Sequence, residues 1–117
     1  MSQFLEQFQM AGCDAKGVMD RFMDDEELLR ECLEQFVAEN DFTGLEDAIS
    51  KADYQTAFEY AHALKGIVGN LGITPVYQPV CVLVEALRTS RTENAPAQLC
   101  DVMKAYERFV EQYKKMR

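Results

Sequence analysis

Hydrophobic residues recur along most of this chain at steps of three and four positions, with polar residues between them. That spacing places the hydrophobic side chains on one face of an α-helix. No segment sustains the strict alternation of hydrophobic and polar residues that marks a half-buried β-strand. The pattern therefore predicts an all-α fold.

Two short helices are predicted in residues 1–23. The first spans residues 3–10 and ends before Gly12, and its apolar residues are Phe4, Leu5 and Phe8. It would cover one end of the core or add apolar surface to a partner site. Asp14 can cap a second short helix that runs as far as Phe22.

A longer helix is predicted to begin near Asp24, because the acidic residues that follow would complement the helix dipole in its first turn. Its apolar face comprises Leu28, Leu29, Cys32, Leu33 and Phe36. The same spacing resumes from Leu45 to Ala52. Between the two parts, Asn40–Gly44 is a poor helical sequence. The residues alone leave open whether the helix kinks or breaks there.

The next predicted helix runs from about Tyr54 to Leu71. Asp53 suits its N-cap, and Gly72 suits its C-terminal end. One apolar stripe follows this helix, and its members are Ala57, Ala61, Leu64, Val68 and Leu71.

Two further helices complete the pattern. Thr74 and Pro75 are predicted as the N-cap and first residue of one of them, and Pro79 would be tolerated there only in the first turn. Its broad apolar face contains Val76, Val80, Leu83, Val84 and Leu87. The last helix opens at residues 94–96 and keeps a nearly heptad rhythm of apolar residues to its end.

The chain has 117 residues, of which 48% are hydrophobic, enough for one domain with its own core. Long helices joined by short connections predict an antiparallel up-down-up-down four-helix bundle over residues 24–117. The short additional helices lie in residues 1–23. We expect this single domain, 1–117, to be a monomer.

The chain carries 12 basic and 20 acidic residues, a net charge of −8. Nucleic-acid binding is disfavoured because it relies on clustered Lys and Arg side chains. The acidic residues concentrate between Asp24 and Asp47, where Arg30 is the only basic residue. We interpret them as a solvated surface that keeps the protein soluble.

No stretch approaches the roughly 18 consecutive apolar residues of a membrane span, and the N-terminal residues lack the features of a signal peptide. We therefore expect a cytoplasmic protein without a membrane segment. The four cysteines form no C-x-x-C pair, which disfavours a zinc site. Cys32 and Cys81 lie among apolar helical neighbours and are expected to be reduced thiols of the core.

His62 is the only histidine of the chain. At about 100° per residue, it lies roughly 140° from the centre of the apolar stripe, so the imidazole faces outward. Gly66 and Gly69 follow on the same outward line, one and two turns later. Lys65 lies one turn on and slightly to the side, where its ammonium can reach a group attached to the imidazole.

The two glycines require a reason, because a glycine inside a helix costs roughly 1 kcal/mol relative to alanine. Close packing of helices is the general explanation. Gly66 and Gly69 point away from the apolar stripe, however, which favours a bare strip of backbone that lets another protein approach His62. Phe58, one turn before His62, belongs either to the edge of the bundle or to the rim of that docking surface.

The sequence His62-Ala63-Leu64-Lys65-Gly66, followed by Gly69-Asn70-Leu71-Gly72, resembles the motif of histidine-containing phosphotransfer (HPt) domains. The acidic start of the helix that reaches Phe36, and the pair Asp53-Tyr54, are similar to that family as well. The resemblance extends from about Val18 onward and is weak in the last helix. It implies a four-helix bundle, and it favours a continuous, kinked helix across Asn40–Gly44.

The resemblance also implies a function. His62 would accept a phosphoryl group from the aspartate of a receiver (response-regulator) domain and pass it on within a multistep phosphorelay, and Lys65 would stabilise the phosphoryl group. Phe58, Gly66 and Gly69 would form the partner-docking surface. No cofactor is expected in this chain, and the partner receiver domain would supply Mg²⁺. The protein would be a phosphocarrier without kinase activity of its own.

The residues themselves fit this chemistry, because an exposed neutral imidazole is a competent nucleophile toward phosphorus. The chain has no P-loop, no kinase-type glycine loop and no persuasive acidic metal cluster. The family resemblance implies a polar residue on the following helix, near the histidine. At that spacing the chain has Val84, followed by Glu85. This departure from the family pattern leaves open which group orients the imidazole.

Two other functions are compatible with the sequence. A non-catalytic helical adaptor would bind a receiver or kinase domain without accepting phosphate, and the intact motif argues against it. An enzyme using His62 as a general base would need a second catalytic group and a pocket, and neither is evident. A histidine-kinase dimerisation domain is disfavoured because the chain has no room for an ATP-binding domain.

Overall fold

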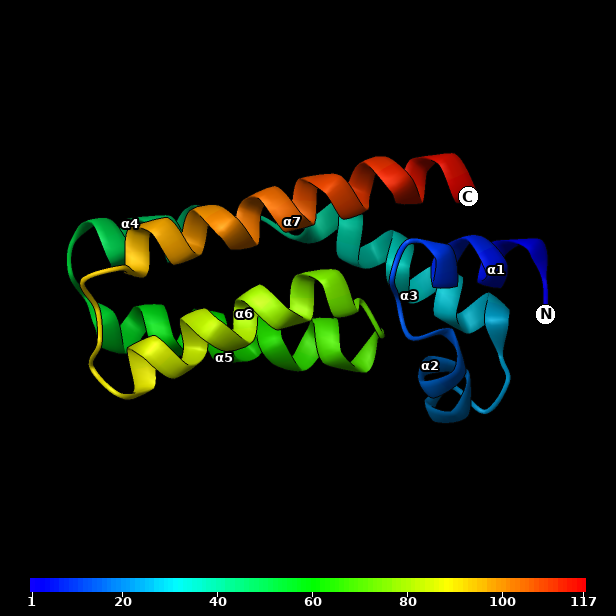
Figure 1. The fold of residues 1–117 in the computed structure, drawn as a ribbon, viewed down its shortest axis with the longest axis horizontal. Coiled ribbons are helices and arrows are strands. Elements are labelled where there is room, and N and C mark those ends of the chain that lie inside the picture. Colours follow the sequence, from blue (N-terminus) through cyan, green and yellow to red (C-terminus); the bar gives the residue numbers. More distant parts are fainter.

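Seven α-helices and no β-strand make up the structure, a computed structural model that describes all residues 1–117 (Figure 1). In chain order the helices are α1 (Gln3–Met10), α2 (Ala15–Arg21), α3 (Glu26–Glu39), α4 (Thr43–Ser50), α5 (Tyr54–Asn70), α6 (Thr74–Arg88) and α7 (Ala95–Met116). The all-α fold class is confirmed. The molecule is elongated, with extents of 44 × 24 × 21 Å.

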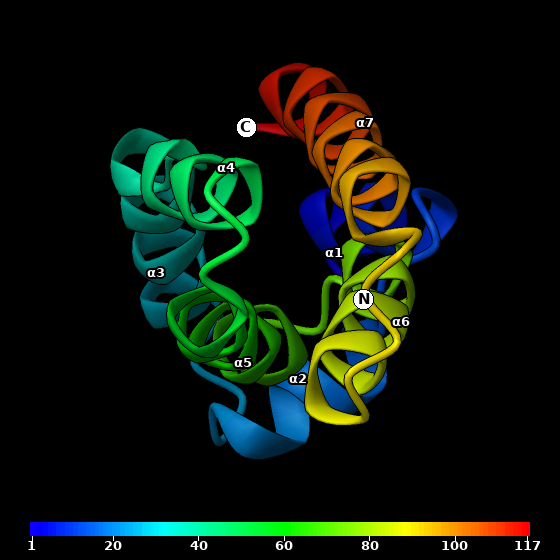
Figure 2. The same ribbon diagram turned by 90° about the vertical axis from the view of Figure 1, so that its left-hand side faces the viewer.

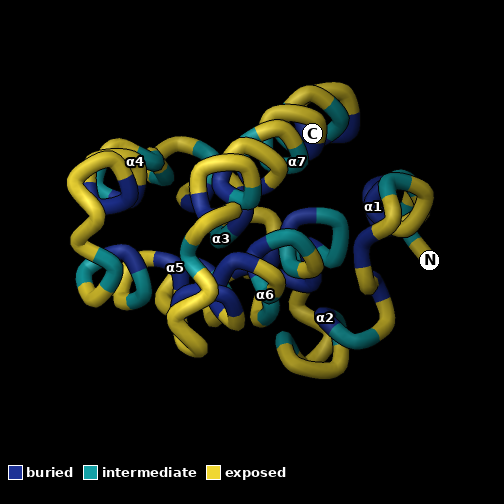
Figure 3. Tube along the Cα trace, turned by 60° about the vertical axis from the view of Figure 1, so that its left-hand side comes forward, coloured by how far each residue is buried: buried dark blue, intermediate teal, exposed yellow.

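Four helical members surround a common centre, as Figure 2 shows in a view along the long axis. They are α5, α6, α7 and the consecutive pair α3 and α4. Helix α5 packs on α6, α6 packs on α7, and α4 contacts both α5 and α7. Of the 31 buried residues, 29 form one hydrophobic cluster, and Figure 3 shows the buried positions on the inward sides of the helices. The predicted helical bundle is therefore present.

The two short N-terminal helices lie across one end of the bundle (Figure 1). The Ser2 hydroxyl oxygen caps α1 by accepting a hydrogen bond from the backbone N–H of Leu5 at 3.1 Å. Asp14 caps α2 as predicted, because its carboxylate accepts from the N–H of Gly17 at 3.0 Å. Both helices bury apolar side chains against the core, so α1 does cover one end of it.

The helix that was predicted to begin near Asp24 begins at Glu26, after Asp25 as its N-cap. It does not continue through Asn40–Gly44, so the continuous, kinked helix favoured by the family resemblance is wrong. Asn40 has an extended backbone that ends α3, with ψ of 130°. The Asp41 carboxylate then accepts a hydrogen bond from the N–H of Thr43 at 3.0 Å, which starts α4 as a separate helix.

The C-terminal end of α5 is held by residues of the α2 region. Gly72 ends the helix with a φ of +71°, which a residue with a Cβ adopts only at a cost, so the predicted terminator is confirmed. The guanidinium of Arg21 donates hydrogen bonds to the carbonyl oxygens of Gly69 and Asn70, both at 3.1 Å. The Gly69 carbonyl also accepts from the N–H of Gly72 at 3.2 Å, and the Arg21 bonds add partners where the regular helical bonds end. Helix α2 therefore fixes the end of the helix that carries His62.

Pro79 is the sixth residue of α6 and not part of its first turn, so the prediction for its position is wrong. The helix also begins at Thr74, one residue earlier than predicted. A proline in a helix interior costs about 3 kcal/mol because a hydrogen bond is lost and the ring clashes with the preceding turn. Burial of one valine side chain contributes about 1.5–3 kcal/mol. Val76 and Val80 are both fully buried on either side of Pro79, so burial can outweigh that cost.

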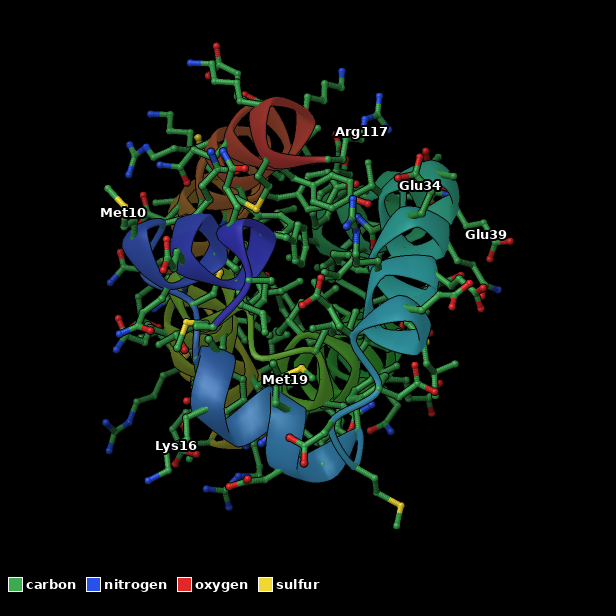
Figure 4. The ribbon with its side chains drawn as sticks, turned by 90° about the vertical axis from the view of Figure 1, so that its right-hand side faces the viewer. Met10, Lys16, Met19, Glu34, Glu39 and Arg117 are labelled. Carbon is green, nitrogen blue, oxygen red and sulfur yellow. The ribbon has the colours of Figure 1, made fainter.

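Polar side chains of α3 join it to both ends of the chain. The hydroxyl group of Ser2 donates to the Glu26 carboxylate at 2.6 Å, and the Arg30 guanidinium lies 4.7 Å from the centre of the Phe4 ring. Near the end of α7, the Tyr113 hydroxyl group donates to Glu34 at 2.6 Å. The Arg117 guanidinium donates to the other Glu34 carboxylate oxygen at 2.7 Å, and Figure 4 shows these two side chains facing each other. These contacts hold α3 against α1 at one end and against the end of α7 at the other.

Candidate functional site

The helical phase predicted for α5 is confirmed by burial. The stripe residues Ala57, Ala61, Leu64, Val68 and Leu71 are all buried, and His62 is exposed. Gly66 is exposed as well, whereas Phe58, Lys65 and Gly69 are half-buried. The five candidate residues therefore lie on or beside the solvent face of one helix.

The imidazole of His62 is stacked on the ring of Phe58, one turn earlier in α5. The two ring centroids are 5.5 Å apart, and the ring planes differ by 19°. Phe58 also packs against the core, which fixes the ring that the imidazole contacts. No hydrogen bond or ion pair of the structure involves the His62 side chain. The contact that orients this imidazole is therefore aromatic stacking.

The helix that follows offers no polar partner to the imidazole. Val84 is 4% exposed and belongs to the core. The carboxylate of Glu85 is engaged by the guanidinium of Arg88, three residues along α6. Val84, at the spacing where the family resemblance implies a polar residue, therefore packs in the core, and the contact that the imidazole makes is with the Phe58 ring.

Lys65 is the cation nearest in sequence to His62, one helical turn away. All four salt bridges of the structure involve other residues, so its ammonium is not neutralised by a carboxylate. A lysine ammonium on a flexible stem acts as a mobile point charge. It can therefore move toward an anion bound at the imidazole without first leaving another partner.

The two glycines of the predicted docking surface have different surroundings. A Cβ atom at Gly66 would meet nothing within 4 Å, as expected for a bare strip of backbone. At Gly69 the Cβ would lie 3.0 Å from the Tyr77 ring, because this side chain of α6 covers the glycine. The prediction that both glycines share one open line is therefore wrong for Gly69. Gly66 alone leaves open space beside His62.

A groove of about 1000 Å³ runs beside α5, between that helix and the α3–α4 pair. Ala63, Gly66 and Ile67 form part of the α5 wall, and Phe36 belongs to the opposite side. Tyr60 closes one end with its ring against Gly44, whose added Cβ would lie 2.5 Å from a ring carbon. This groove was not predicted from the sequence, although Tyr60 and Ile67 are apolar residues of α5 that lie off its buried stripe.

The structure contains no group of three or more His, Cys, Asp or Glu side chains placed to hold a metal ion. All four cysteines are free thiols. Cys32 is half-buried and packs against the core, as predicted, whereas Cys81 is half-buried and does not, so its assignment to the core is wrong. Cys13 is the fully buried thiol. Burial raises the pKa of the Cys13 thiol to about 12, which keeps it protonated and unreactive. None of the helices is both long enough and apolar enough to span a bilayer.

A family model described as "Hpt domain" matches residues 26–114 of the chain. The matched range begins with α3 and includes all of α4, α5 and α6, and therefore the whole surface around His62. Comparisons with curated proteins and with solved structures find no significant match.

Proposed function

The chain belongs to the Hpt domain family, whose members are phosphocarriers of two-component signalling, and from this premise we propose that His62 is its phospho-accepting residue. We propose that the protein relays a phosphoryl group between aspartates of receiver domains in a multistep phosphorelay. The observation that carries this proposal is the exposed imidazole of His62 on α5, next to an unpaired Lys65 and the open backbone of Gly66.

In the forward step, the lone pair of an unprotonated imidazole nitrogen attacks the phosphorus of a receiver's aspartyl phosphate. A nitrogen–phosphorus bond forms, and the phosphorus–oxygen bond to the aspartate breaks. The aspartate leaves as a carboxylate and keeps the electron pair. The proton on the other imidazole nitrogen remains there or passes to water. The reverse step transfers the phosphoryl group from His62 to the aspartate of the next receiver.

Phosphoryl transfer needs positioning and neutralisation of charge more than covalent chemistry from the acceptor. This chain supplies the positioned imidazole, stacked on Phe58, and one cation at Lys65. The receiver domain would supply Mg²⁺ and the phosphorylated aspartate. The protein would therefore act as a phosphocarrier that neither binds nucleotide nor phosphorylates itself.

The open space over Gly66 supports direct docking of a receiver on α5, because a partner must bring its aspartate within bonding distance of the imidazole. We propose that the protein does this as a monomer. A cytoplasmic location belongs to the same proposal, and the four free thiols fit a reducing compartment.

The alternative function is that of a helical adaptor, which would bind a receiver or kinase domain without taking up phosphate. It would use the same open surface but would not need the imidazole or the unpaired cation. An enzyme with His62 as general base gains no support from the groove, because His62 does not line it.

The deciding experiment mixes the purified protein with candidate receiver domains that carry a labelled aspartyl phosphate. Label should appear on the wild-type protein and be acid-labile and base-stable, as expected for a phosphoramidate bond. A His62→Gln variant should fold normally and take up no label. Stable receiver binding without any label on the wild-type protein would instead support the adaptor.

A further inference from the structure

Two large apolar side chains of α5 remain exposed in the groove beside the α3–α4 pair. Tyr60 is 51% exposed and Ile67 is 46% exposed. Ala63 beside them is exposed as well, whereas Phe36 and Leu71 of the same groove are buried. Apolar surface gathered in a concave site is typical of an interface, because burying it against a partner is favourable.

The groove is continuous with the face of α5 that carries His62. Ala63 follows His62 directly, and Gly66 lies one turn beyond it; both residues line the groove. A protein that approaches the imidazole over the bare backbone of Gly66 therefore reaches the groove without crossing another helix. The partner that meets His62 and the partner that fills the groove can be the same molecule.

The charge of the groove identifies the chemistry of that partner. Glu39 and Asp41 lie in its lining, and no Lys, Arg or His residue does. Figure 4 shows the side chain of Glu39 extending from α3 into solvent. Arg30, the only basic residue between Asp24 and Asp47, is occupied by Glu26 and by the Phe4 ring. The groove thus presents exposed apolar surface beside uncompensated carboxylates.

We infer that this groove is a second part of the receiver-docking surface, and that it selects receivers whose contact segment places an aliphatic or aromatic side chain between Lys or Arg residues. This inference rests on the proposed phosphotransfer at His62. The apolar side chain would bury Tyr60 and Ile67, and the basic residues would face Glu39 and Asp41. Complementary charge at the edge of an interface favours the correct partner and its rate of association. The groove would therefore determine which receivers exchange phosphoryl groups with His62.

A matched pair of variants tests the apolar part. Ile67→Asp places a carboxylate in the groove, and Val82→Asp makes the same change at a 55% exposed aliphatic residue of α6 outside it. We use the receiver domain that transfers label fastest to the wild-type protein. Ile67→Asp should raise the Kd for that receiver at least tenfold, and Val82→Asp should change it less than twofold. Phosphorylation of His62 by phosphoramidate, a small phosphodonor that needs no docking, should stay within twofold of wild type in both variants.

A second pair tests the charge. Glu39→Lys and Glu107→Lys change the net charge equally, but Glu107 lies on α7 and outside the groove. Glu39→Lys should slow association with the receiver several-fold at low salt, and the difference should shrink as salt is added. Glu107→Lys should associate at nearly the wild-type rate.

The outcomes separate this inference from the proposed function. If Ile67→Asp receives label from the receiver at the wild-type rate, and wild-type His62 is labelled, the inference that receivers dock in the groove is contradicted. The proposed phosphotransfer at His62 is then still supported. A wild-type dimer that Ile67→Asp dissociates would assign the groove to a second copy of this chain and overturn the inference as well. If neither receivers nor phosphoramidate label the wild-type protein, the proposed function fails, and the groove inference fails with it.

Discussion

The ring of Phe58 lies against the imidazole of His62, with 5.5 Å between their centroids and 19° between their planes. Such an offset pair restricts the rotation of an exposed side chain without a hydrogen bond to either ring nitrogen. Both nitrogens consequently remain free, and in the proposed transfer one of them would attack phosphorus while the other would hold or release its proton. Phe58 is itself held by the core. The packing of the bundle therefore fixes the ring against which the proposed nucleophile is stacked.

Replacing Phe58 by leucine should slow phosphorylation of His62 even with phosphoramidate as donor. Leucine keeps an apolar side chain against the core but lacks a flat ring, and aromatic pairs are worth about 0.5–1.5 kcal/mol beyond their buried area. We expect a loss of about two- to tenfold in rate, with a melting temperature only slightly lowered. Phe58→Tyr retains the ring and should restore the rate. Equal rates for the leucine and tyrosine variants would contradict an orienting role.

Lys65→Ala should slow transfer from a phosphorylated receiver by about tenfold, which corresponds to about 1.4 kcal/mol of transition-state stabilisation. The physical reason is the loss of an ammonium that no carboxylate of this chain neutralises. Lys104→Ala, an exposed lysine of α7, serves as the control and should transfer at the wild-type rate. Single-turnover label transfer measures both. A wild-type rate in Lys65→Ala would show that this lysine takes no part in the reaction.

Most of the fold could be predicted from the sequence, because helical periodicity and caps are local. The limits of α1 and the caps at Asp14 and Asp53 follow from a few neighbouring residues. The break before α4 did not follow, because it depends on the extended backbone of Asn40 and on one side-chain hydrogen bond from Thr43 to Asp41. The position of Pro79 inside α6 is likewise set by tertiary burial, which the local rule for proline ignores.

The candidate site was predictable as far as it lies on one helix. The phase of α5 gives the exposure of His62 and the open surroundings of Gly66. It cannot show that Tyr77 of α6 covers Gly69, because the relation between two helices is not contained in the periodicity of either one. The groove was missed for the same reason, since α3 and α5 enclose it together.

The buried Tyr113 predicts a loss of stability at high pH. Burial raises the pKa of Tyr113 to about 12, and the hydrogen bond and negative charge of Glu34 add to the effect. An unfolded tyrosine ionises near pH 10. Below pH 10 both states are protonated, and the contribution of Tyr113 to stability is fully present. Between pH 10 and 12 the unfolded state loses its proton first, so this contribution falls as the pH rises.

Urea unfolding of Tyr113→Phe measures this contribution. Near pH 8 the variant should be less stable by about 1–2 kcal/mol, because it lacks the hydrogen bond to an ionised carboxylate. From pH 10 upward its midpoint should fall less steeply than that of the wild-type protein, since phenylalanine does not titrate. Parallel pH profiles for the two proteins would mean that Tyr113 has the same pKa in the folded and unfolded states.

The last prediction compares the two glycines of α5. Helix propensity treats both glycines alike, but their surroundings in the structure differ. On helix propensity alone, leucine in place of an exposed helical glycine stabilises by up to about 1 kcal/mol. Gly66→Leu meets no neighbouring atom at its Cβ, so its melting temperature should stay the same or rise. Its side chain would nevertheless occupy the approach to His62, and receiver binding should weaken severely.

Gly69→Leu should behave in the opposite way. Its Cβ would lie 3.0 Å from the Tyr77 ring, and overpacking of this kind costs about 1–3 kcal/mol, which outweighs the gain in propensity. We expect a lower melting temperature for Gly69→Leu than for Gly66→Leu. We also expect receiver binding closer to wild type at temperatures where the variant is folded. Thermal unfolding and receiver titration of the two variants measure both differences. A stabilised Gly69→Leu that blocks the receiver would return Gly69 to the docking surface, with Tyr77 displaced to make room for the leucine.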